Sequence, residues 1–289
     1  MSNATETQLS HRIEQLLVER NLRGMAELRG HLQPGYCLRA AQWLRDCQGP
    51  VLIGTGFPVL DTFETDGPAG AIALYRVLSA QGATPILVCN ERLATALAGD
   101  YRVEAMPLGQ PPELLEQVKE IVSRIAPELV ISIELPGRAA DGRYYNMRGE
   151  DISDRTFCFD DFLALANCPS IAIGDGGNEI GMGNVTEGLA GLDIIPSATR
   201  CGELVIADVS NWAAHGLVAM LSFWSGRDHL AEWDNRAVLE YLAERGSVDG
   251  VTRENTLSED GLPSESGKVL VTVLQQLVDD ARNSNGAVD

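Results

Sequence analysis

The sequence predicts an α/β fold, in which a mostly parallel open sheet carries helices on both faces in a Rossmann-like three-layer arrangement. Two observations predict it. Between residues 50 and 225, short apolar runs alternate with segments of helical periodicity, and parallel strands need such crossover helices to connect them. The apolar runs are continuous and do not alternate with polar residues, which is typical of strands buried from both sides.

A helical N-terminal extension, residues 1–48, precedes this region. Apolar residues recur at helical spacing over 9–29 and indicate a helix there. Residues 37–47 predict a second, shorter helix. The pattern then changes to the apolar run 51–53, which predicts the first buried strand and leads into a glycine-containing loop at 54–56.

The next helix is predicted from its two ends. Asp66 is the expected N-cap and Pro68 lies in the first turn, and the helix ends near Gln81 because Gly82 follows. The alternation then predicts a strand at 85–89, a helix at 91–98, a strand around Val103, a helix from Pro111 to Ile125, strands at 129–133, 171–173 and 204–207, and a helix at about 211–224.

The whole chain, 1–289, is expected to form a single α/β domain. Its core is residues 50–225, and the helical extension lies before it. Residues 226–289 predict an acidic, helical C-terminal part, with a loop at 247–263 and a terminal helix at 264–282.

The charge of the chain excludes several classes of partner. It has 41 acidic and 22 basic residues among 289, a formal net charge of −19, whereas nucleic acids and anionic membranes attract basic proteins. Only two basic residues are lysines, Lys119 and Lys268, and neither follows a glycine loop. This disfavours Walker-type ATP binding and Schiff-base chemistry, because both need a positioned amine.

The cysteines and the N-terminal residues bear on the compartment. Six cysteines stand at positions 37, 47, 89, 158, 168 and 201, without the spacing of a zinc site or a redox pair. Residues 1–10 are polar, and no apolar run approaches the roughly 20 residues that span a bilayer. We therefore expect a cytoplasmic protein with buried thiols, and neither nucleic acid nor membrane as a partner.

The chemistry is expected where the strands end, because ligands of open parallel sheets bind beyond the carboxyl ends of the strands. Glycines and charged residues follow three predicted strands, in the segments 54–68, 134–148 and 174–183. Any one such segment is equally well explained as a tight turn and a cap. Three together favour a site.

The segment 174–183 is the most informative of the three. Gly176 and Gly177 leave backbone N–H groups unobstructed, so the turn can form a nest for a carboxylate or phosphate. Asp175 and Glu179 are four residues apart, so a helical turn would place both carboxylates on one face. Such a pair can divide into an acid and a base, or bind a divalent cation. In the alternative reading, Asp175 caps the turn and Glu179 is solvated.

Other residues carry weaker signals. The loop 54–56 resembles the start of a dinucleotide fingerprint, but position 59 is valine where a third glycine would stand. Asp66 is explained by capping as well as by catalysis. The loop after residue 133 contains Arg138, Arg143 and Arg148, which could be solvated or could hold an anion.

Four stretches resemble signatures of the D-glutamate cyclase family. They are Gly174-Asp-Gly-Gly-Asn-Glu-Ile-Gly-Met-Gly183; Gly54-Thr-Gly-Phe-Pro58 with Glu64-Thr-Asp-Gly-Pro68; Pro136-Gly-Arg138 through Asp141-Gly142 to Tyr145-Asn-Met-Arg-Gly149; and Val209-Ser-Asn-Trp212. The resemblance covers about residues 50–225, in the expected order. One departure is Ala213, where the family pattern has glycine after the tryptophan.

The resemblance implies a carbon–oxygen lyase that converts free D-glutamate to 5-oxo-D-proline and water. The residue roles follow from chemistry. We expect Asp175 as base and Glu179 as acid, with Asp66 as a third catalytic carboxylate. The expected substrate-binding residues are Thr55, Gly56, Arg138, Asn146, Arg148, Gly176, Gly177 and Asn178. The arginines would bind carboxylate, and Asn178 with the two glycine amides would bind the oxyanion.

Two other functions remain open from the sequence. The same carboxylates could serve a metal-dependent hydrolase of a phosphate or sugar acid, and the fold could be a nucleotide-binding module. No cofactor is required by the sequence; a divalent cation, Mg²⁺ or Ca²⁺, would bind to Asp66, Asp175 or Glu179. The expected partner is a small amino-diacid substrate. The sequence is also compatible with a homo-oligomer.

Overall fold

Six parallel strands form the central sheet, in the order β5-β4-β1-β6-β7-β8. The structure is a computed structural model that describes residues 3–286. The strands are β1 (Pro50–Thr55), β4 (Thr84–Asn90), β5 (Val103–Met106), β6 (Leu129–Ile133), β7 (Ser170–Gly174) and β8 (Glu203–Ile206). All six expected strands form, and the predicted parallel α/β sheet is confirmed.

The order of the strands reverses between β1 and β6. From β1 the chain moves outward through β4 to β5, and it then returns to pair β6 with the other edge of β1. In such a sheet the crossover connections on the two sides of the reversal diverge and leave a crevice at the carboxyl ends of the two central strands. β1 and β6 therefore determine where a site can form.

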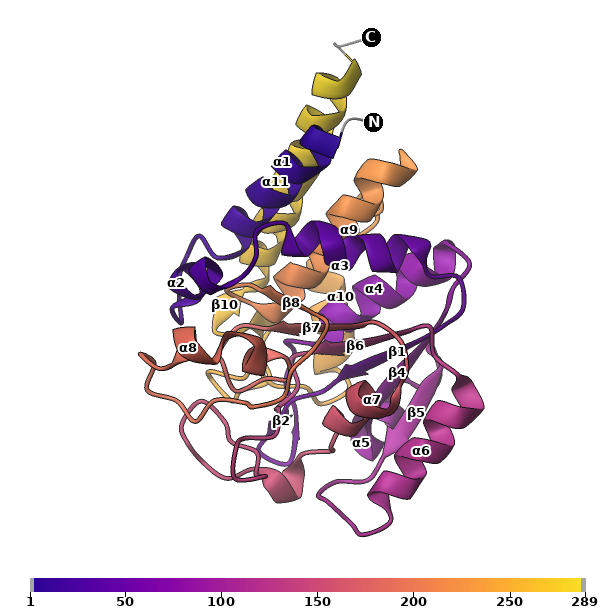
Figure 1. Cartoon of the computed structure of the whole chain (residues 1–289), viewed down its shortest axis with the longest axis vertical. Coiled ribbons are helices and arrows are strands. Elements are labelled where there is room, and N and C mark those ends of the chain that lie inside the picture. Colours follow the sequence, from indigo (N-terminus) through magenta and orange to yellow (C-terminus); the bar gives the residue numbers. More distant parts are fainter. Residues whose placement is uncertain (1–2, 287–289) are drawn as a thin grey trace.

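Helices cover both faces of the sheet, as Figure 1 shows. They are α1 (Asn3–Leu17), α2 (Met25–Leu28), α3 (Tyr36–Asp46), α4 (Pro68–Ala80), α5 (Glu91–Leu97), α6 (Leu114–Ile125), α7 (Asp160–Leu165), α8 (Thr186–Leu189), α9 (Ser210–Ser225), α10 (Asn235–Ala243) and α11 (Ser264–Gly286). Helices α3, α4 and α9 pack together on one face, and α5, α6 and α7 lie on the other. No helix among residues 3–286 is long and apolar enough to cross a bilayer.

The N-terminal helix is shorter than expected. The sequence predicts a helix over 9–29, but α1 ends at Leu17 and the short α2 follows. The reason is Asp208, which follows β8: its carboxylate accepts the backbone N–H groups of Arg20 (2.8 Å) and Leu22 (3.1 Å). Asn21 between them adopts a positive φ of 52°, so the chain turns there and brings the next residues over the sheet.

The C-terminal part contains more structure than the expected loop. Helix α10 lies in the part that is expected to be helical, although the sequence analysis gives no bounds for it, and the segment 247–263 includes a hairpin of β9 (Ser258–Glu259) and β10 (Leu262–Pro263). A second small hairpin, β2 (Pro58–Val59) and β3 (Thr62–Phe63), follows β1. The two terminal helices, α1 and α11, lie side by side and extend beyond the sheet (Figure 1). Both helices also contact α9, so both terminal parts of the described chain are anchored to the core.

Two helices of one face cap each other, and this corrects the expectation for Asp66. The N-cap of α4 is Gly67, with a φ of 90°. Asp66 accepts the Gly67 amide and also the Ser210 (2.9 Å) and Asn211 (2.7 Å) amides that open α9. In return, Asn211 Oδ1 accepts the amides of Gly67 (2.9 Å) and Gly70 (2.7 Å) at the start of α4. Each helix start is therefore satisfied by a side chain of the other.

Replacing the reciprocal cap should cost more than replacing an ordinary one. We expect Asn211→Ala to lower the free energy of unfolding by about 2–3 kcal/mol, because it leaves the buried Gly70 amide without its acceptor and removes one of the two acceptors of the Gly67 amide. Asp234→Ala is the control, since Asp234 is exposed and caps α10 through a single amide, that of Ala237 (3.1 Å). It should cost about 1 kcal/mol. Urea unfolding measures both, and equal costs would contradict the reciprocal cap.

Candidate functional site

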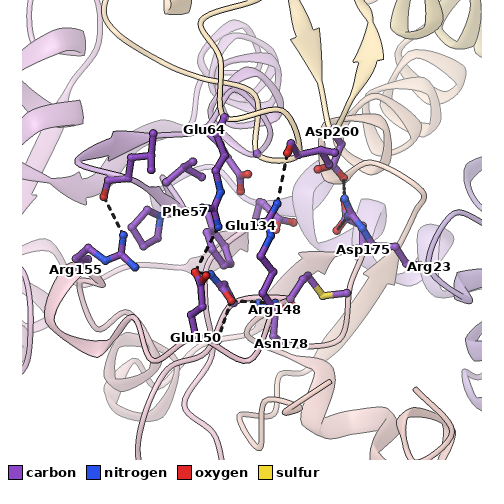
Figure 2. A pocket seen from close by; sticks show the side chains of 18 residues that line it. Arg23, Phe57, Glu64, Glu134, Arg148, Glu150, Arg155, Asp175, Asn178 and Asp260 are labelled. Atoms are coloured by element: carbon purple, nitrogen blue, oxygen red, sulfur yellow. Dashed lines mark hydrogen bonds and ion pairs between the residues drawn. The ribbon is translucent and has the colours of Figure 1, made fainter. Parts of the chain in front are cut away.

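A cavity of about 230 Å³ opens at the carboxyl ends of β1, β6 and β7. Its lining residues, shown in Figure 2, are Arg23, Phe57, Pro58, Val59, Leu60, Glu64, Glu134, Asn146, Met147, Arg148, Glu150, Arg155, Asp175, Asn178, Gly250, Val251, Arg253 and Asp260. The volume is below the roughly 300–1,000 Å³ of sites for drug-sized ligands. The cavity therefore fits a small metabolite.

Four buried carboxyl groups gather at this cavity from separate parts of the chain, and the exposed Glu150 also lines it. Glu134 directly follows β6 and Asp175 directly follows β7. Glu64 follows the β2–β3 hairpin, and Asp260 lies in the turn between β9 and β10. Each of these side chains is nearly or fully buried. The strand ends supply two of the groups, and the two hairpins supply the others.

Arg23 provides the positive charge among these carboxyls. It comes from the turn between α1 and α2, and its guanidinium pairs with Asp175 and, through Nη2, with Asp260 Oδ2 (2.5 Å). Burial alone would lower the pKa of Arg23, but Asp175, Asp260 and Glu134 raise it, and the net result is a rise. Arg23 therefore stays charged and holds the two aspartates together.

The pKa values of the carboxyl groups are raised. Burial raises the pKa of Asp175 to about 8, with the nearby charges of Asp66 and Glu179 adding to the rise and Arg23 opposing it. Burial, again with neighbouring carboxylates, also raises the pKa of Glu64, Glu134 and Asp260 well above the usual range. Like charges in a buried cluster cannot all ionise together. The cluster consequently retains protons at neutral pH.

The backbone around the cavity adopts rare conformations. Six residues other than glycine have a positive φ in the described part of the chain, and four of them line the cavity: Leu60 (54°), Glu134 (44°), Arg253 (60°) and Asp260 (56°). A side chain in this region of φ costs energy, and such residues concentrate at functional sites. The fold holds Glu134 and Asp260 in place against this cost.

The predicted site residues divide into those that line the cavity and those that do not. Asp175, Asn146, Arg148 and Asn178 line it. Asn178 donates its amide to the Tyr145 carbonyl (2.9 Å), which joins two of the predicted segments. Asp66 lies behind the cavity, where its oxygens accept the amides described above, and burial raises its pKa to about 7. The roles assigned to these residues stay predictions.

The segment around Glu179 is arranged differently from the expectation. Glu179 is neither solvated nor on the cavity wall: its Oε1 accepts the Gly176 amide (2.9 Å) and its Oε2 accepts the Gly177 amide (2.7 Å). Gly177 has the positive φ, 107°, that this tight turn requires. The nest predicted for a ligand is therefore filled by a carboxylate of the same loop, and these two amides are not free for an oxyanion.

Thr55, Gly56 and Arg138 also stand away from the cavity wall. Thr55 is the last residue of β1 and is fully buried, and Gly56 follows it with a φ of 109°. Arg138 pairs with Asp161 (3.2 Å) and contacts Cys158 Sγ (2.9 Å). The expected role of Arg138 in carboxylate binding is not supported, because its guanidinium is already engaged there.

Sequence reasoning missed several lining residues. Glu64 and Glu134 stand in the segments singled out after the first and fourth strands, so their position was a usable signal. Arg23 and Asp260 lie in the two terminal parts, outside the region of family resemblance, and nothing local marks them. Only the packing of the chain ends on the core brings them to the cavity.

The residues do not fit a divalent cation while Arg23 is in place. Two sets have carboxyl oxygens within 4.8 Å of one another: Asp66, Asp175 and Asp260; and Glu134, Asp175 and Glu179. In the first set, Arg23 already pairs with two of the carboxylates. In the second, both oxygens of Glu179 accept amides. Mg²⁺ or Ca²⁺ would need these oxygens as ligands, and would have to displace Arg23.

A comparison with known families gives the relationship. The profile described as "D-glutamate cyclase-like, C-terminal" matches residues 13–277. The chain belongs to this family. The match extends beyond the predicted resemblance at 50–225 and includes both Arg23 and Asp260, so the whole cavity lies within the family's region.

One known enzyme and one solved structure match parts of this chain. Human mitochondrial D-glutamate cyclase is 35% identical over an alignment of 198 residues, which covers 59% of this chain and 32% of the human protein. The match therefore spans about a third of the human protein's length. A solved exopolyphosphatase-related protein from Bacteroides fragilis gives a TM-score of 0.33 at 9% identity, covering 83% of this chain and 60% of that one. So low a score carries no functional argument.

The raised pKa values predict a stability that falls as pH rises. For Glu64 the folded-state pKa lies above the unfolded value, so its contribution is fully present below the unfolded pKa and is lost as pH rises toward the folded one. Asp66 (about 7) and Asp175 (about 8) extend this loss to about pH 8. Each group can contribute a slope of up to about 1.4 kcal/mol per pH unit.

Glu64→Gln should reduce that slope. Urea unfolding between about pH 5 and about pH 9 should show the free energy of unfolding falling less steeply for the variant than for the unsubstituted protein. Glu116→Gln, at an exposed position of α6, should leave the slope unchanged. Parallel curves for Glu64→Gln and the unsubstituted protein would contradict the proposed ionisation of the cluster.

Proposed function

We propose that this protein converts free D-glutamate to 5-oxo-D-proline and water. The observation that supports this most directly is the buried group of proton-holding carboxyls around Arg23, at the carboxyl ends of the central strands. Family membership and the identity to the human D-glutamate cyclase support the substrate class. The small cavity volume fits an amino acid.

The reaction is mainly a redistribution of protons. The nitrogen lone pair attacks the γ-carboxyl carbon, a C–N bond forms, and one C–O bond breaks. The ammonium group loses two protons, and the departing oxygen gains two and leaves as water. The substrate and the product both carry a net charge of −1, so the site needs groups that accept and donate protons in turn. Carboxyls with pKa values near neutrality suit this exchange.

The distribution of charge supports one orientation of the substrate. The ammonium group would lie near Asp175 and Glu134, whose carboxyl oxygens can accept its N–H groups as hydrogen bonds. Arg148 lines the cavity and has no carboxylate within 4.0 Å among the described residues, so it is available to a substrate carboxylate. Holding both ends in attack geometry would supply much of the rate.

We propose Asp175 as the group that takes protons from the ammonium group. As the proton donor we propose Glu134 instead of Glu179, because Glu134 lines the cavity and Glu179 is held by the two glycine amides. Glu134 Oε2 accepts a hydrogen bond from Ser210 Oγ (2.5 Å), which orients the carboxyl. Asn178 remains a proposed ligand of the substrate oxygen.

Two observations disfavour the nucleotide-binding alternative. In dinucleotide-binding folds the pyrophosphate lies at the N-terminus of the helix after the first strand. Here that helix is α4, and Asn211 Oδ1 already accepts its Gly67 and Gly70 amides. The cavity of about 230 Å³ is also below the roughly 300–1,000 Å³ of sites for drug-sized ligands, so it is small for a dinucleotide. The hydrolase alternative would use a metal, which Arg23 opposes.

The function is tested with D- and L-glutamate in separate incubations, followed by chiral chromatography of 5-oxoproline. We expect 5-oxo-D-proline from D-glutamate at a rate far above the uncatalysed one, and much less product from L-glutamate. The incubation is repeated in EDTA and after addition of Mg²⁺. Product that depends on added metal would support the metal alternative, and absence of product from both enantiomers would overturn the proposed function.

The residue roles are tested by isosteric substitution. Asp175→Asn and Glu134→Gln should each lower kcat by about 10²–10⁴-fold, the usual contribution of a general acid or base. The matched control is Glu259→Gln, because Glu259 is fully buried next to Asp260 but accepts hydrogen bonds from Asn211 and Asn235 and does not line the cavity. It should lower the melting temperature and leave kcat nearly unchanged. Full activity of Asp175→Asn would refute its assignment.

A further inference from the structure

We propose that Arg155 is a specificity-determining residue that binds the α-carboxylate of the amino-diacid substrate. This inference rests on the proposed cyclisation. It gives Arg155 the role that the sequence predicted for Arg138, which is engaged with Asp161 and Cys158 instead.

Hydrogen bonds and buried neighbours fix the backbone of Arg155. It ends a short 3₁₀ helix, Ser153–Arg155, whose flanking residues Ile152 and Thr156 are buried. The Arg155 amide donates to the Ile152 carbonyl (2.9 Å), and Thr156 Oγ1 donates to the same carbonyl (3.0 Å). Ser153 Oγ accepts the Tyr144 amide (3.0 Å) from the neighbouring loop. Because this backbone segment is already ordered, the side chain of Arg155 can bind a ligand at a lower entropic cost.

The guanidinium of Arg155 lines the cavity, and most of its N–H groups are available to a ligand. Its Nη1 donates to the carbonyl of Leu60 (3.1 Å), and Arg155 lines the cavity together with Phe57 (Figure 2). Leu60 adopts its rare positive φ at the tip of the β2–β3 hairpin. A guanidinium has five N–H donors, so one contact with a carbonyl orients the group and leaves a fork for a carboxylate.

The charge of Arg155 is also uncompensated. Four arginines line the cavity: Arg23, Arg148, Arg155 and Arg253. Arg23 pairs with two aspartates and Arg253 with Glu150 (3.4 Å). Within the described residues, neither Arg148 nor Arg155 has a carboxylate within 4.0 Å. In a chain with a net charge of −19, two such cations at one cavity indicate that the missing anion belongs to the ligand.

The chemistry of the reaction decides which carboxylate Arg155 binds. A guanidinium lowers the pKa of an adjacent carboxyl and so keeps it ionised. The γ-carboxyl has to gain protons so that its oxygen can leave as water, and it therefore belongs near the proton-holding Glu134 and Glu64. The α-carboxylate stays ionised in both substrate and product. It is therefore the group that a fixed positive charge can hold throughout the reaction.

The first test measures D-glutamate binding by calorimetry and turnover by 5-oxoproline formation. Arg155→Gln should weaken binding and raise KM by roughly 10- to 100-fold, with kcat changed less than about 3-fold, because a charge-assisted contact present throughout the reaction is lost. Arg155→Lys should recover part of the affinity, since it keeps the charge but not the fork.

The matched control is Arg92→Gln. Arg92 Nη1 donates to the carbonyl of Asp61 (2.6 Å), the residue next to Leu60 at the same hairpin tip, but Arg92 does not line the cavity. If the effect of Arg155 came only from support of the hairpin, the two substitutions would behave alike. We expect Arg92→Gln to leave the affinity and KM for D-glutamate unchanged.

Substrate analogues then test the carboxylate assignment. Affinities are measured for D-glutamate α-amide and for its γ-amide, D-glutamine. The penalty of Arg155→Gln should persist for the γ-amide and vanish for the α-amide. Three outcomes would each overturn the inference. Arg155→Gln could weaken the binding of both amides equally, it could weaken the binding of the α-amide but not of the γ-amide, or it could leave the affinity for D-glutamate unchanged. If D-glutamate binds with this pattern but yields no 5-oxoproline, the proposed function fails while the binding role of Arg155 stands.

Discussion

The ion pairs of Arg23 with Asp175 and Asp260 are the interaction on which the site depends. Burying several carboxyl groups together is costly unless a counter-charge and hydrogen bonds compensate. Arg23 provides that charge, and Asp208 fixes the turn that delivers it. One guanidinium thus joins the end of β7 to the N-terminal turn and the β9–β10 hairpin. The carboxyl cluster as a whole still holds protons, and this is the property that an intramolecular dehydration uses.

Much of the fold was predictable from local patterns. Each of the six expected apolar runs forms a strand, and these six strands lie in one parallel sheet, because strands buried on both faces pair side by side in the core. The pairing of β1 with both β4 and β6 was not predicted, since strand order depends on contacts far apart in sequence. The early end of α1 was also missed: a carboxylate 188 residues from Arg20 terminates that segment.

The candidate site was predictable in part. Asp175 and Asn178 lie in the conspicuous glycine-rich segment, and their place at the cavity follows from the end of β7. The same segment misled the assignment of Glu179, because sequence spacing does not say whether a nest binds a ligand or its own loop. For the arginines, the sequence did not distinguish the one that lines the cavity from the one that is engaged elsewhere. Arg138 and Arg155 both stand in polar loops, and only their neighbours distinguish an engaged guanidinium from an available one.

The side-by-side packing of α1 and α11 has a consequence for how this family is delimited (Figure 1). The conspicuous signatures occupy the middle of the chain, but the two ends deliver a cation and an acid to the same cavity. A fragment limited to residues 50–225 would keep Asp175 in the cavity but would lose Arg23, the cation that pairs with it. The functional unit must therefore include the residues that balance the buried charges. It extends well beyond the stretch in which sequence similarity is most visible.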